Sequence, residues 1–246
     1  MKQQPKSEAW GWATRLAFRF CFVYFGLFAL ATQVTGSLLP VISFRGLGPL
    51  WPMREREPAA GGCVLFLGTL EPRKNVGVLV DAYERLLARR PDAPPLMLAG
   101  RVTPEAEALV SRTRRSPLAG RVEVLGYIAP ERRLELYGRA VVFVLPSHTE
   151  GFGMPAAEAM MTGVPVIAAN RGALQQTVGS AGRLIDPDDA EALSRALDEV
   201  LADQALRDRM RDAGRRHAEQ FTWARTARSL RDAWSLAVEE RTRRRG

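Results

Sequence analysis

Short apolar runs alternate with longer charged segments through most of the chain. The apolar runs are rich in Val, Ile and Leu and end near Gly, Pro or Ser, which is typical of strands buried on both faces. They lie at residues 63–67, 96–100, 122–125, 141–145, 164–169 and 181–185. Helical segments are predicted between and after them at residues 76–89, 104–115, 130–139, 156–162, 171–179, 189–201, 204–220 and 222–241. Because strands alternate with helices, the chain is predicted to be an α/β, Rossmann-like parallel sheet with helices on both faces.

Residues 20–44 break this alternation, because they contain no charged side chain over a length that suits a membrane helix. Polar residues and Pro40 weaken that interpretation, and a buried helix, an interfacial or re-entrant anchor, and a fused or truncated gene product remain alternatives. Cations before the run favour a cytoplasmic N-terminus. The predicted division is an apolar, membrane-associated segment at residues 1–45, a linker at 46–62, an α/β domain at 63–241 and a basic tail at 242–246.

Composition limits the classes of function. The chain has 246 residues, 46% of them hydrophobic, and a net charge of +8. Its Arg residues are dispersed among Glu and Asp and show no aromatic-basic motif, so nucleic-acid binding is disfavoured while attraction to an anionic membrane surface is retained. Cys21 and Cys63 form no zinc or disulfide pattern, and Cys63 is predicted to be a buried thiol. His148 and His217 lack ligand spacing, and His217 is expected on a solvated helix face.

Candidate chemistry gathers where the strand at 141–145 turns into the next helix. Glu150 is followed by Gly151, Phe152, Gly153 and Met154, and Glu158 lies inside the helix. The backbone N–H groups at a helix N-terminus suit an anionic phosphate, and glycine lets the backbone approach closely. Carboxylates accept hydrogen bonds from hydroxyls. Each Glu alone could equally be an ordinary solvated residue, but the pair with the glycine turn between them indicates a binding site.

This segment resembles the E-x7-E signature of retaining glycosyltransferases of the GT-B fold, family 4, and the resemblance extends over residues 62–241. The α/β domain would then be the single C-terminal, donor-binding half of that fold. Resemblance implies that Glu158 holds ribose hydroxyls, and that Glu150 with the backbone of residues 151–153 holds the sugar. Gln175 and Gln176 stand where the family usually has a Pro-Glu pair.

Two further turns match the family. Arg73 and Lys74 follow the first strand, where two cations could neutralise a diphosphate. Taken alone they could also be a solvated helix start. Tyr127 and Ile128 follow the third strand, where the family's backbone lies along the nucleobase, although Tyr127 could equally be a packing residue. All three turns fall at the carboxyl ends of parallel strands, as expected for one site.

The implied activity is transfer of a hexosyl group, with retention, from a nucleotide-diphosphate sugar to a glycan or lipid-linked acceptor of the cell envelope. No cofactor and no metal are expected, because no Asp-x-Asp motif stands in a suitable strand context and no G-x-G-x-x-G follows the first strand. The expected place is the cytoplasmic face of the membrane, as a peripheral or single-span protein, or the cytoplasm if residues 20–44 form no span. A single span with a cytoplasmic N-terminus would conflict with this place, because it would separate the domain from nucleotide-sugars.

The acceptor-binding half of such enzymes has no counterpart before residue 63. Two alternatives therefore accompany the complete enzyme. The chain could be a donor-binding half that is inactive alone, with a partner chain that supplies the acceptor domain. It could also be a membrane-tethered nucleotide-binding module without turnover.

Overall fold

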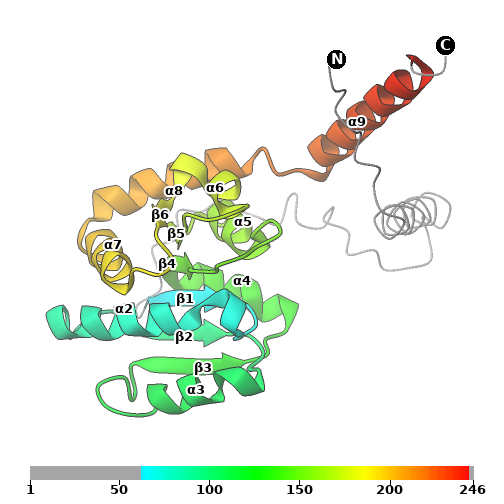
Figure 1. Cartoon of the computed structure of the whole chain (residues 1–246). Helices are drawn as coiled ribbons and strands as arrows, with labels where there is room; N and C mark the ends of the chain where they lie inside the picture. The colour runs from blue at the N-terminus through cyan, green and yellow to red at the C-terminus, as the bar shows by residue number, and fades with distance from the viewer. Residues whose placement is uncertain (1–61, 244–246) are drawn as a thin grey trace, which may run out of the picture. The chain divides into compact units, whose positions relative to one another are not determined.

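The computed structural model describes residues 62–243 (Figure 1), which belong to the compact unit Arg56–Gly246. The predicted apolar segment 1–45, the linker up to residue 61 and the end of the basic tail lie outside the described residues. Within the described range, no helix combines the length and the apolar character that a membrane crossing requires.

The centre of the fold is a parallel, 6-stranded sheet in the order β3-β2-β1-β4-β5-β6. The strands are β1 (Cys63–Leu67), β2 (Leu96–Ala99), β3 (Val122–Gly126), β4 (Ala140–Leu145), β5 (Val166–Ala169) and β6 (Arg183–Ile185). The order reverses at β1, because the chain adds β2 and β3 on one side and then returns to place β4 on the other. The carboxyl ends of β1 and β4 are therefore neighbours, which is where open α/β sheets bind ligands.

Helices connect the strands and cover the sheet. Short 3-10 turns are η2 (Pro72–Lys74), η3 (Pro104–Ala106) and η4 (Gly179–Ala181). The α-helices are α2 (Val76–Arg89), α3 (Glu107–Thr113), α4 (Pro130–Arg139), α5 (Met154–Met161), α6 (Leu174–Thr177), α7 (Ala190–Ala202), α8 (Gln204–Ala218) and α9 (Trp223–Arg243). Right-handed crossovers place α2 and α3 on one face and α4 and α5 on the other (Figure 1). The sheet is thus covered on both faces, as the alternating pattern predicted.

Strands β1, β2, β4 and β5 supply the centre of the core. All of their side chains are buried except that of Val141, which is partly exposed. Cys63 is fully buried at the start of β1, and this burial raises the pKa of its thiol to about 11, which confirms the predicted buried thiol.

Helix α5 ends at a left-handed glycine. Gly163 has φ 76° and its N–H donates to Met160 O at 2.9 Å, while the N–H of Val164 donates to Ala159 O at 2.8 Å. These two bonds form a Schellman motif that satisfies the last carbonyls of the helix. Because Val164 closes the helix, β5 begins at Val166 and not at residue 164, and the strand prediction was two residues too long.

Other predictions needed correction at the ends of elements. The segment 104–115 forms η3 followed by α3 instead of one helix, and residues 179–181 form η4 before β6. Asp189 caps α7 by accepting the N–H of Ala192 at 2.8 Å, so the helix begins at Ala190, one residue later than predicted. In α4, Leu134 is 42% exposed, whereas Leu136 and Tyr137 are buried.

Candidate functional site

The turns that follow β1 and β4 lie against each other. The backbone N–H of His148 donates to Arg73 O at 3.0 Å, and Asn75 Nδ2 donates to Pro146 O at 3.3 Å. Asn75 has a left-handed φ of 52°, which asparagine tolerates better than most residues. Between these contacts the hydroxyl of Ser147 is buried and has no hydrogen-bond partner among the described atoms. The two turns are thereby joined into one rim at the carboxyl edge of the sheet.

Lys74 and Glu150 form the most buried ion pair among those described. Lys74 Nζ lies 2.6 Å from Glu150 Oε1, and the two side chains are 11% and 8% exposed. Arg73 lies above them, with Nη1 2.9 Å from Thr149 O and 3.8 Å from Glu150 Oε2. A buried charge is costly unless it is paired, so this pair must form for the turns to pack. The structure thus brings together Arg73, Lys74 and Glu150, as the sequence predicted.

Gly153 sets the path of the chain into α5. Its φ is 84°, and a Cβ added there would lie 2.5 Å from Leu174 Cδ2, so glycine is required both by conformation and by space. Gly153 is the N-cap residue of α5 and no side chain caps the helix. Met154 is the first helical residue and is 53% exposed, and Pro155 has no N–H to satisfy. The N-terminus of α5 therefore opens beside Glu150 with its dipole unopposed by an acidic residue in the first turn.

Phe152 anchors this glycine turn to the C-terminal part of the domain. Its carbonyl accepts the hydroxyl of Thr177, and its ring meets that of Phe221 edge to face at 5.2 Å. Phe221 in turn contacts the ring of His217 at 5.4 Å. His217 Nε2 lies 3.1 Å from Thr177 O, so the prediction of a solvated His217 was wrong. His217 therefore connects α8 to Thr177 at the end of α6, a contact that helical periodicity alone does not predict.

Glu158 has a different set of partners, which come from α4. Tyr137 donates its O–H to Glu158 Oε2 at 3.0 Å and lies 3.1 Å from Pro155 O. Arg133 Nη1 lies 3.2 Å from Glu158 Oε1. The Glu158 side chain is 27% exposed, so it is not closed off from a ligand. The sequence reasoning singled out Glu158 but missed Tyr137 and Arg133; their i,i+4 spacing, which puts them on one face of α4, was the available signal.

The third predicted turn, at residues 127–128, follows β3. Gly126 has φ 67°, which turns the chain at the end of the strand. Tyr127 is 76% exposed, so its side chain is not a packing residue, whereas Ile128 is buried in the core. Tyr127 is thus available to a ligand, and only the backbone of Ile128 could contact one.

Gln175, where the sequence departs from the family pattern, bonds within its own loop. Its Nε2 donates to Asn170 Oδ1 at 3.0 Å. The family's pair would place proline at this position and the carboxylate at Gln176, and proline has no side-chain donor that could make this bond. Among the described residues, no group of His, Cys, Asp or Glu is arranged to hold a metal ion.

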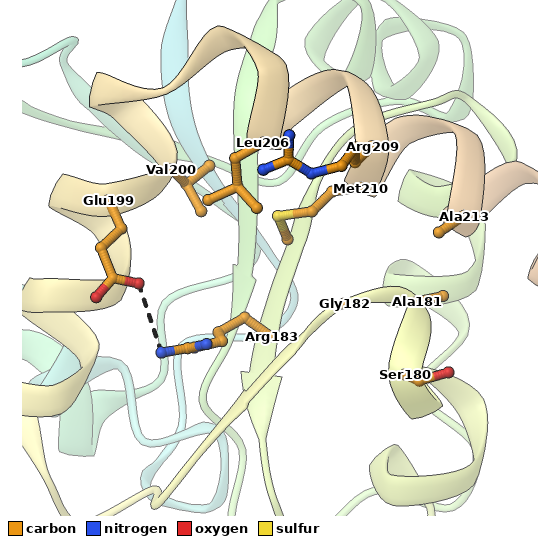
Figure 2. A pocket seen from close by; sticks show the side chains of 10 residues that line it. All are labelled: Ser180, Ala181, Gly182, Arg183, Glu199, Val200, Leu206, Arg209, Met210 and Ala213. Carbon is orange, nitrogen blue, oxygen red and sulfur yellow. Dashed lines mark ion pairs between the residues drawn. The ribbon is translucent and has the colours of Figure 1, made fainter.

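A separate pocket of about 260 Å³ lies between β6, η4, α7 and α8 (Figure 2). Arg183 and Glu199 face each other at its side, 3.4 Å apart, and Leu206 and Met210 contribute its apolar wall. None of the sequence-predicted site residues lines this pocket.

Comparison with known proteins identifies the fold. Over 184 residues the chain is 37% identical to the O-antigen chain mannosyltransferase B of Escherichia coli, which covers 75% of this chain and 48% of that protein. Sucrose-phosphate synthase from Thermosynechococcus elongatus superposes with a TM-score of 0.64 at 30% identity, over 75% of this chain and 47% of that one. Anabaena HepE, solved in complex with UDP and glucose, gives 0.63 at 25% identity, over 72% and 49%.

The chain spans about half the length, or less, of the curated relatives it matches. A sequence model described as "Glycosyl transferases group 1" matches residues 53–217, which is most of the described domain. The sheet order, the joined turns and this match together show that the chain belongs to the glycosyl transferases of group 1.

Proposed function

We propose that the chain binds a nucleotide-diphosphate sugar and takes part in transfer of its hexosyl group, with retention of configuration, to a glycan or lipid-linked acceptor. The observation that carries the proposal is the contact of Lys74 and Arg73 with Glu150 beside the N-terminus of α5. Such a cluster offers two cations and a helix dipole to a diphosphate, next to a carboxylate that can accept sugar hydroxyls. Glu158, further along the same helix, would accept hydroxyls of the ribose.

The chemistry of this site would be stabilisation of the leaving group. When the bond between the anomeric carbon and the diphosphate breaks, its electron pair stays on the diphosphate oxygen. Lys74 can share its three donors between Glu150 and a phosphate oxygen, and Arg73 presents a planar fork. Each preorganised donor would contribute on the order of a few kcal/mol to the transition state. No step in this description requires a cofactor or a metal.

The names of the relatives are the basis for proposing a class of donor and acceptor. One relative is named for mannose and the O-antigen chain, others for D-inositol 3-phosphate, and HepE was solved with UDP and glucose. Mannose and glucose in these names favour a hexosyl donor, and the O-antigen name favours an acceptor of the cell envelope. We place the protein at the cytoplasmic face of the membrane, because residues 20–44 carry no charge and the net charge is +8. Sedimentation of the full chain with anionic lipid vesicles tests that placement.

A second candidate has its own support. The candidate groups among the described residues all belong to the proposed donor site, so a donor-binding half that needs a partner chain for its acceptor site is the alternative. Calorimetric titration of the purified chain with GDP-mannose and UDP-glucose, followed by measurement of released nucleoside diphosphate, separates the candidates. Binding with release supports the enzyme, binding without release supports the half-enzyme or a module without turnover, and no binding to a wider panel of nucleotide-sugars contradicts them all.

A further inference from the structure

Tyr137 is held rigidly behind Glu158. Its side chain is 1% exposed, and its ring meets Phe143 of β4 edge to face at 5.8 Å with an interplanar angle of 61°. A buried tyrosine has two side-chain torsions to fix, and here the core fixes both. The hydroxyl therefore occupies a defined position at the junction of α4 and α5.

The hydroxyl has one proton and two acceptors within reach. Glu158 Oε2 lies 3.0 Å away and Pro155 O lies 3.1 Å away. The charged carboxylate is the stronger acceptor, because hydrogen bonds to ionised groups are stronger than those between neutral ones. Burial, together with the negative charge of Glu158, raises the pKa of Tyr137 above its ordinary value, so the hydroxyl remains a donor at every physiological pH.

Arg133 holds the other side of the same carboxylate. Its Nη1 lies 3.2 Å from Glu158 Oε1 and 3.5 Å from Oε2, and it sits one helical turn before Tyr137. The Arg133 side chain is 38% exposed, so its grip is weaker than that of the buried hydroxyl. The torsions of Glu158 are thus set mainly by Tyr137, while each carboxylate oxygen retains a lone pair for a ligand.

We propose that Tyr137 is a positioning residue, which fixes the Glu158 carboxylate in the orientation that receives the two ribose hydroxyls of a bound nucleotide. This inference rests on the proposed function, because it assigns the residue that orients Glu158 toward the ribose in that site. It predicts that the Tyr137 hydroxyl affects affinity only when both Glu158 and the ribose hydroxyls are present.

Tyr137→Phe tests this, because it keeps the ring and removes only the hydroxyl. The probes are GDP and UDP, each compared with its 2′,3′-dideoxy analogue by calorimetry. We expect Tyr137→Phe to weaken binding of the ribonucleotide about 5- to 20-fold, less than the loss of a whole hydrogen bond to a charged group because the hydroxyl acts through Glu158, and to change binding of the dideoxy analogue less than about 2-fold.

A double-mutant cycle with Glu158→Gln separates positioning from general damage to the fold. In the Glu158→Gln background, the Tyr137→Phe change should have almost no further effect on affinity. Tyr83→Phe is the matched control. Tyr83 lies on α2, is also fully buried, and donates its O–H to Pro94 O at 2.8 Å. It should lower the free energy of unfolding by an amount similar to Tyr137→Phe and leave nucleotide affinity unchanged.

The outcomes separate a failure of the proposed function from a failure of the role assigned to Tyr137. If the unaltered chain binds neither GDP nor UDP nor any nucleotide-sugar of the wider panel, the proposed function fails and this inference fails with it. If the unaltered chain binds and Tyr137→Phe binds equally well, or loses the same factor with dideoxy analogues or in the Glu158→Gln background, the positioning role alone is overturned.

Discussion

Glu150 and Glu158, which lie on either side of the turn at residues 151–153, have different surroundings. Glu150 is 8% exposed and pairs with the equally buried Lys74, so both charges are shielded from water. Glu158 is 27% exposed and is held by a neutral hydroxyl and a partly solvated guanidinium. A buried pair costs much when one partner is lost, whereas a solvated one costs little. The Glu150 carboxylate is therefore expected to affect the stability of the fold, whereas the Glu158 carboxylate can affect ligand binding with little effect on stability.

Replacing Lys74 by Ala should have the largest effect. The change leaves the buried Glu150 carboxylate with only the more distant Arg73, 3.8 Å away, so the free energy of unfolding should fall by about 3 kcal/mol, the lower end for a broken buried pair. Chemical denaturation measures this. In the fraction that folds, affinity for a nucleoside diphosphate should fall more than affinity for the nucleoside.

The control for Lys74→Ala is Arg85→Ala, which removes an exposed partner of Glu191. That change should lower the free energy of unfolding by less than about 1 kcal/mol. Equal losses in the two variants would contradict the contrast between buried and solvated pairs, and equal losses of diphosphate and nucleoside affinity would contradict a phosphate contact.

Gly153→Ala should have the next largest effect, because it acts on the turn that connects the two carboxylates. The positive φ and the nearness of Leu174 predict a loss of about 1–3 kcal/mol in the free energy of unfolding. Gly151→Ala is the matched control, since a Cβ there meets no atom within 4 Å and its φ is not positive. Thermal unfolding of both variants compares them, and a Gly151→Ala variant that is the less stable would refute the assignment of strain to Gly153.

Glu158→Gln should change binding more than folding. Glutamine keeps the shape and one acceptor oxygen, but it loses the charge that attracts hydroxyl protons, so nucleotide affinity should fall about 10-fold, or ~1.4 kcal/mol. The midpoint of denaturation should move little. Calorimetry with GDP and UDP decides the matter: unchanged affinity for both would remove Glu158 from the ribose site.

Arg133→Ala should have the smallest effect. Arg133 is the counterpart of Lys74 on the second carboxylate, but it is 38% exposed, so its loss should lower the free energy of unfolding by no more than about 1 kcal/mol. Denaturation under the conditions used for Lys74→Ala gives the direct comparison. A loss as large as that of Lys74→Ala would show that the two carboxylates are equally tied to folding.

Much of the fold was accessible from the sequence because its signals are local. The apolar runs that end near Gly and Pro located the six strands, and the bounds of α2 and α4 were predicted to the residue. The errors lie at element ends such as residues 164–165 and 179–181, where cap bonds and a 3-10 turn compete with strand propensity. Such competition is decided by backbone hydrogen bonds, which composition does not reveal.

The site was accessible only in part. Arg73, Lys74 and Glu150 were predicted because they match motifs of the family, and because each follows a parallel strand whose end lies near that of its neighbour. The partners of Glu158 were missed because Tyr137 shows only the signature of a core residue, and its hydroxyl reaches Glu158 through packing of α4 on α5. His217 was misassigned for the same reason, since its partner Thr177 is remote in sequence.

The edge-to-face contact between Phe152 and Phe221 has a consequence for where this polypeptide can be cut or joined to others. Phe221 comes after the last helix that packs on the sheet side, yet it supports the loop nearest the proposed chemistry. A version of this domain made by gene rearrangement or in the laboratory would therefore keep this ring contact only if it extended past residue 221. A shorter one would keep every strand and the bond from Thr177 to the Phe152 carbonyl, but the Phe152 ring would lose its aromatic partner.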